Sequence, residues 1–279
     1  MHEPFTTTDL KYRFKHYFTF TSDEYRHLLI TAVVAGFILS FRKWGIEQFN
    51  FVIGVTNLVL AICIAFGSLY IHIFFQKLCG LKVGYFPKYR SYPTLLGIGF
   101  LLTVFTNGLI PFFPPGCISY DINERMRLGK LRKGYTTWEA SLVSFAGPLA
   151  NIFIAEVLGF VYLIAPSDFL FSVIAINLLV ALYAMLPIPQ IIKPSKKKLA
   201  EAGGMIVTGT NPLYNLELRE GGPAGLFVFI HHRGFFVLTF CLTLFYSGLV
   251  LSVNLFSLIL AIFMSLVTAI AYYYLVEQG

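Results

Sequence analysis

Long runs of apolar residues alternate with short polar segments along this chain. At a rise of 1.5 Å per residue, six of these runs can cross the hydrocarbon core of a bilayer as helices. They occupy residues 28–41, 50–78, 141–165, 169–187, 235–251 and 253–275. The pattern predicts an all-α polytopic membrane protein with about six transmembrane helices.

The composition agrees with this class. Hydrophobic residues make up 57% of the 279 residues and charged residues only 13%, with a mean hydropathy of +0.72. A soluble domain of this size cannot hide so much apolar surface. The net charge of +7 comes from basic residues that lie between the apolar runs. They are therefore expected to face the headgroups of the lipid bilayer, and nucleic acid is not expected as a partner.

A seventh apolar run, residues 94–113, contains glycines and a proline and ends in FFPPG at 112–116. This composition argues against one straight helix. If the run spans the membrane, the lysines and arginines are found in large numbers on both sides, which the positive-inside rule disfavours. If it is a re-entrant or hairpin segment, every Lys and Arg except Arg42 and Lys43 falls on one side. The positive-inside rule thus predicts six spans with both termini in the cytoplasm. The expected location of the protein is the cell membrane.

These elements divide the chain into four parts. The expected parts are a cytoplasmic segment at 1–27, a membrane core at 28–187 that includes the non-spanning segment 79–140, a cytoplasmic loop at 188–234, and a two-helix membrane segment at 235–279.

Four segments carry a resemblance to a known family through their order and spacing. They are KLCGLKVGYFPKY (77–89), FFPPGCISY (112–120), SFAGPLANIFIAEVL (144–158) and INLLVALYAMLPIP (176–189). Together they resemble the site-2 proteases, which are intramembrane zinc metalloproteases, and in particular archaeal-type members. The resemblance covers about residues 28 to 215. It implies a membrane helix bearing H-E-x-x-H, with a later Asp in L-P-I-P-x-L-D-G as the third zinc ligand.

The zinc motifs are degenerate on this resemblance. Aligned on Gly80, the first histidine corresponds to Ser68, the catalytic glutamate to Leu69, and the second histidine to His72. The segment AGGMIVTGTNPLY places Ala202 where the family has its aspartate. A catalytic zinc site needs three protein ligands, and losing a general base costs about 10²- to 10⁴-fold in rate. The expectation is no cofactor and no hydrolysis, with His72 and Ala202 as vestigial metal positions.

The binding part of the motif is retained. Gly147 allows close helix approach, Pro148 suits the first turn of a helix, and both are expected to begin the third span. The resemblance assigns Asn151 to hydrogen bonds with an extended segment that enters the site. The alternative is a helix start with an interhelical hydrogen bond. His72 is expected to be a buried neutral imidazole bonded to the backbone or to Ser68.

The preferred hypothesis is a site-2-protease-like protein without proteolytic activity, acting as a binding or scaffold subunit, or as an assembly factor, for membrane proteins. One alternative is a transporter, although the spans offer only His72 and Glu156 as ionisable groups, which would pair if their helices pack. The other alternative is an active metalloprotease with a non-standard site. Such a site would combine His72 with Cys79, Glu201, His231 or His232.

Overall fold

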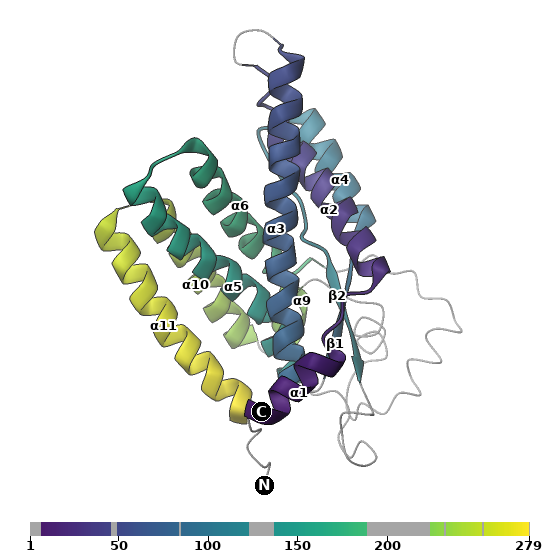
Figure 1. The fold of residues 1–279 in the computed structure, drawn as a ribbon, viewed down its shortest axis with the longest axis vertical. Coiled ribbons are helices and arrows are strands. Elements are labelled where there is room, and N and C mark those ends of the chain that lie inside the picture. Colours follow the sequence, from purple (N-terminus) through teal and green to yellow (C-terminus); the bar gives the residue numbers. More distant parts are fainter. Residues whose placement is uncertain are drawn as a thin grey trace.

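The part of the chain that the structure describes folds into a mainly helical bundle with a small sheet (Figure 1). The computed structural model describes residues 7–45, 49–83, 85–122, 137–188, 224–231, 233–252 and 254–278. The elements of these residues are α1 (Thr7–Tyr17), α2 (Ser22–Ser40), α3 (Phe51–Val83), β1 (Tyr85–Arg90), α4 (Pro93–Phe105), β2 (Cys117–Ile122), α5 (Thr137–Ile164), α6 (Asp168–Ala184), α9 (Ala224–His231), α10 (Arg233–Leu251) and α11 (Leu255–Gln278).

Three helices in the described part of the chain are long and apolar enough to cross a membrane. They are Phe51–Val83, Trp138–Ile164 and Arg233–Leu251. Shorter apolar helices occupy Pro93–Phe105, Asp168–Ala184 and Leu255–Thr268. A helix therefore coincides with each predicted apolar run, and the prediction of a mainly helical protein with apolar helices suited to a membrane is confirmed.

Helix α3 stands at the centre of the bundle, between α2 on one side and α5 and α6 on the other (Figure 1). One hydrophobic core joins α2, α3 and α6, and includes Leu28, Leu69 and Val180. A second core joins α5, α6, α10 and α11 around the fully buried Tyr246. Helix α6 contributes residues to both and therefore links the two cores.

The start of α2 is fixed by a capping box and by a buried ion pair. Thr21 accepts a hydrogen bond from the Glu24 backbone, and the Glu24 carboxylate accepts one from the Thr21 backbone. The same carboxylate lies 2.8 Å from Lys77 Nζ near the end of α3 and accepts the backbone N–H of Tyr89 in β1 at 3.0 Å. Glu24 thus joins α2, α3 and β1.

Strands β1 and β2 form a two-stranded antiparallel sheet, with Tyr89 opposite Ile118. The all-α class did not include this sheet. The prediction was incomplete because a strand pair formed by chain segments about thirty residues apart leaves a weak signal in one sequence. Part of the segment 188–234 also differs from a loop, since Ala224–His231 forms helix α9, which packs against α5.

Candidate functional site

The candidate site lies where α3 faces α5. Ser68 and His72 stand one helical turn apart and so share one face of α3, and both side chains are buried. Leu69, which the sequence resemblance aligned with a catalytic glutamate, is also fully buried, but it packs into the core shared with α2 and α6. The α3 face toward α5 therefore carries a hydroxyl and an imidazole.

Asn151 of α5 lies opposite these two groups. Its amide Nδ2 is 3.5 Å from Ser68 Oγ and 3.5 Å from His72 Nδ1. These long contacts are weak hydrogen bonds. The described structure thus gives His72 an amide partner on another helix, where the sequence had suggested Ser68 or the backbone. Asn151 Oδ1 is buried without a hydrogen-bond partner among the described residues.

Gly147 allows α5 to approach α3 closely. A Cβ atom at this position would lie 2.6 Å from His72 Nε2, nearer than real Cβ contacts allow. The imidazole therefore rests directly on the backbone of α5. The expectation of a close helix approach at this glycine agrees with the geometry.

Pro148 does not begin a helix, and the expectation that it occupies a first turn was wrong. Helix α5 begins at Thr137, so Pro148 lies inside it. Without an N–H, Pro148 cannot donate to the carbonyl of Ser144, which is four residues earlier. Gln76 of α3 donates its Nε2–H to Ser144 O at 3.0 Å. A side chain from the neighbouring helix thus supplies the donor that the proline lacks.

Gln76 is a site residue that the sequence reasoning missed. It follows His72 by one turn on the same α3 face and is almost fully buried. With Nε2 donating to Ser144, the other amide atom, Oε1, has no hydrogen-bond partner among the described residues. The spacing of Ser68, His72 and Gln76 at every fourth residue was the signal that could have revealed it.

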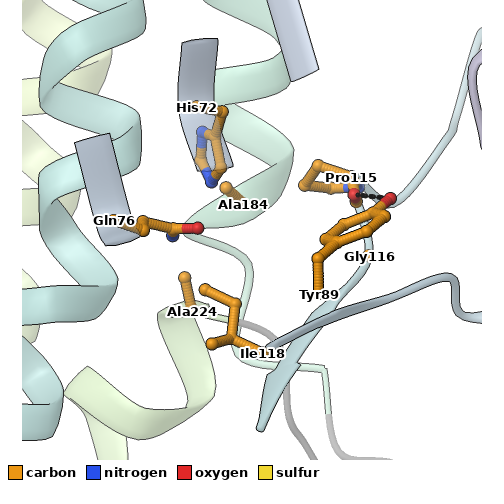
Figure 2. A pocket seen from close by; sticks show the side chains of 8 residues that line it. All are labelled: His72, Gln76, Tyr89, Pro115, Gly116, Ile118, Ala184 and Ala224. Carbon is orange, nitrogen blue, oxygen red and sulfur yellow. Dashed lines mark hydrogen bonds between the residues drawn. The ribbon is translucent and has the colours of Figure 1, made fainter. Parts of the chain in front are cut away.

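His72 and Gln76 line a small hollow that Figure 2 shows together with its other walls, and the Gln76 oxygen points into it. The enclosed space is about that of one water molecule. None of the lining residues is acidic, so the hollow offers hydrogen-bonding groups but no carboxylate base. The full lining is His72, Gln76, Tyr89, Pro115, Gly116, Ile118, Ala184 and Ala224.

Tyr89 forms the wall of the hollow opposite α3. Its buried hydroxyl bonds to Pro115 O at 2.7 Å and to the Thr31 hydroxyl at 2.8 Å, and burial raises the pKa of the phenol above its usual value. Gly116 has φ +115°, and a Cβ there would lie 2.4 Å from the Tyr89 ring. Only glycine fits beside this ring.

Glu156 does not pair with His72, although their helices pack together. The fully buried Glu156 accepts a hydrogen bond from Ser265 of α11. It lies five residues beyond Asn151 on α5, and this offset directs its side chain to a different neighbour from that of Asn151. The suggested Glu156–His72 pair is therefore wrong.

The donors at the α3–α5 face do not fit a catalytic zinc ion. One imidazole, one hydroxyl and an amide that already contacts the imidazole fall short of the three nitrogen, sulfur or carboxylate ligands that zinc takes. Across the described part of the chain, no group of three or more His, Cys, Asp or Glu residues is placed to hold a metal. Ala202, Glu201 and His232 lie outside the described residues, and for His231 the description covers only the backbone.

Comparison of the chain with protein-family models, curated proteins and solved structures finds no match.

Proposed function

We propose that this chain is a site-2-protease-like membrane protein without proteolytic activity, and that it binds an extended or transmembrane segment of another membrane protein at the face shared by α3, α5 and β2. The observation that carries the proposal is the pair of buried amide oxygens at this face, Gln76 Oε1 and Asn151 Oδ1, which lack hydrogen-bond partners among the described residues.

An unsatisfied buried acceptor costs about 1–3 kcal/mol. An extended segment can remove this cost, because its backbone N–H groups are not used within a helix. Gln76 Oε1 points into the hollow beside Ile118 of β2 (Figure 2), so a segment that enters there would meet an acceptor. The hollow has space for about one water molecule, and binding therefore requires its walls to move apart.

The loss of catalysis is supported by the residues around His72. On the resemblance, Leu69 stands where a protease has its general base. Its side chain cannot accept a proton, and it is packed in a hydrophobic core whose members on α3 are also apolar. Ser68 and His72 already share the Asn151 amide. The remaining groups suit recognition by hydrogen bonds.

The proposal includes six spans, with residues 93–116 as a hairpin and both termini in the cytoplasm. Helix α4 has 13 residues and so reaches about 20 Å, less than the roughly 30 Å of the hydrocarbon core. The turn at Asn107 and Gly108 has positive φ values, and Gly108 lies against Arg42 at the end of α2. Strands β1 and β2 flank residues 93–116 and pair with each other, which supports a segment that enters and leaves the membrane on the same side.

Thiol labelling tests this topology. In a background without the native cysteines, Lys88→Cys and Glu139→Cys flank the hairpin, and Lys43→Cys marks the opposite side. An impermeant thiol reagent should label Lys88→Cys and Glu139→Cys from the same side of sealed membranes. Labelling of these two positions from opposite sides would show that residues 93–116 span.

Photo-crosslinking tests the binding function. A photoreactive residue at Ile118 lines the hollow, while the same residue at Phe263, exposed on α11, reports contacts with the surrounding lipid. In native membranes the Ile118 probe should yield a discrete protein adduct that the Phe263 probe does not. Gln76→Met should weaken that adduct, because it removes the acceptor that points into the hollow.

The proposal would be overturned if the Ile118 probe formed adducts only within the chain itself or with lipid. Cleavage of a membrane protein by the purified chain, abolished by His72→Ala, would contradict the claim of inactivity.

A further inference from the structure

Helix α1 combines basic and aromatic side chains on an exposed face. Lys11, Tyr12, Lys15 and His16 are all exposed, and the Tyr12 and His16 rings lie in contact, with their centroids 4.4 Å apart. In an α-helix these four positions fall on adjoining stripes of one side. The helix therefore presents cations and an amphipathic ring together.

The other side of α1 is attached to the bundle. The Phe14 and Phe18 rings stack on each other with centroids 4.5 Å apart, and both contact the ring of Phe74 in α3. Arg13 Nη1 donates to Leu81 O in the last turn of α3 at 3.2 Å. These contacts fix which face of α1 is turned outward.

Helix α1 lies across the end of α3 and does not run beside it (Figure 1). Helix α3 is one of the candidate membrane spans, and its 33 residues reach about 50 Å, which exceeds the roughly 30 Å of the hydrocarbon core. Its last turn, which carries Lys82, therefore extends past the core to the level of the headgroups. Short helices with basic and aromatic residues at this level lie in the plane of the interface. The outward face of α1 is therefore placed among lipid headgroups.

Further exposed basic residues lie at this end of the bundle. Arg26, Lys88 and Arg90 are exposed on neighbouring elements, whereas the carboxylate of Glu24 is buried against Lys77. The acidic residues nearby in the sequence are Asp9 in α1 and Asp23 in α2. A cationic, partly aromatic surface at an interface complements an anionic headgroup.

We propose that the exposed face of α1, formed by Lys11, Tyr12, Lys15 and His16, binds the headgroups of anionic phospholipids together with the exposed Arg26 of α2. The cations contact the phosphate groups and the Tyr12 ring inserts at the boundary with the acyl chains. Each basic residue near an anionic surface strengthens association about fivefold. The surface is separate from the α3–α5 face and does not depend on the function proposed there.

Native mass spectrometry of the full chain provides the test. The protein is purified in the presence of equimolar phosphatidylglycerol and phosphatidylcholine, and the ratio of the two lipids that remain bound is measured. The wild type should retain phosphatidylglycerol preferentially. The triple variant Lys11→Gln, Lys15→Gln and Arg26→Gln should lose this preference by roughly tenfold or more, because three cations are removed.

The matched control is Arg42→Gln with Lys43→Gln, which removes exposed cations at the opposite end of α2 and should leave the preference unchanged. Added inorganic phosphate should not displace the lipid, since a free anion lacks the acyl chains. Unfolding temperatures in phosphatidylcholine alone should be equal for all variants, because the substituted side chains are exposed. Equal retention by wild type and triple variant, equal loss in the control, or displacement by phosphate would overturn the proposal.

Discussion

The link between Pro148 and Gln76 yields the sharpest stability prediction. Pro148 deprives Ser144 O of its usual helical donor, and Gln76 Nε2 supplies one from α3 at 3.0 Å. Gln76→Met keeps the length of the side chain but removes the donor. A buried hydrogen bond contributes about 1 kcal/mol net to the free energy of unfolding. We therefore expect Gln76→Met to destabilise the protein by about 1 kcal/mol.

The Pro148→Ala background separates this effect from general loss of packing. Alanine restores the N–H that can bond Ser144 O within α5, so Gln76→Met should cost less there than in the wild type. A double-mutant cycle isolates the difference as a coupling energy, expected to be about 1 kcal/mol. Unfolding in mixed detergent micelles, followed by circular dichroism, provides the four free energies. A coupling energy of zero, or a larger cost of Gln76→Met in the Pro148→Ala background, would show that Gln76 does not compensate for Pro148.

Three further substitutions test other parts of the site. Gly147→Ala would place a Cβ 2.6 Å from His72 Nε2, and the overpacking should lower the free energy of unfolding by about 1–3 kcal/mol, with Gly248→Ala, which meets open space, as the control. Lys77→Met leaves the Glu24 carboxylate buried without its cation and should cost about 3–5 kcal/mol in the same assay; a cost no larger than that of Lys15→Met would contradict the role of the pair. Tyr89→Phe removes the hydroxyl from its contacts with Pro115 and Thr31 and should cost about 1–2 kcal/mol. Burial raises the pKa of Tyr89, so the difference in unfolding free energy between wild type and Tyr89→Phe should stay constant around neutral pH. It should decline only as the pH rises above the unfolded-state pKa of about 10 toward the higher folded-state pKa; a decline near pH 7 would contradict the buried state of the phenol.

The apolar runs predicted where the helices lie, because burial in a bilayer demands long apolar segments whatever their neighbours are. The run 50–78 corresponds to α3, and 235–251 to α10. The close approach at Gly147 was also predictable, because small residues in membrane helices commonly lie where two helix backbones approach closely.

Contacts between distant segments were not predictable in the same way. The position of Pro148 inside α5 was missed because a proline after glycine fits a first turn equally well, and only the Gln76 donor explains how the interior position is tolerated. The partner of Glu156 was misassigned because the sequence does not reveal that α11 packs against the side of α5 that carries Glu156. The sheet depended likewise on the pairing of two segments separated by α4.

The metal content of the full chain, purified in a mild detergent and measured by mass spectrometry of the elements, tests the central claim most directly. We expect no stoichiometric zinc, and the same trace content in wild type and in His72→Ala, because His72 faces an amide and a glycine backbone and lacks two further ligands. One zinc ion per chain that is lost in His72→Ala would contradict it.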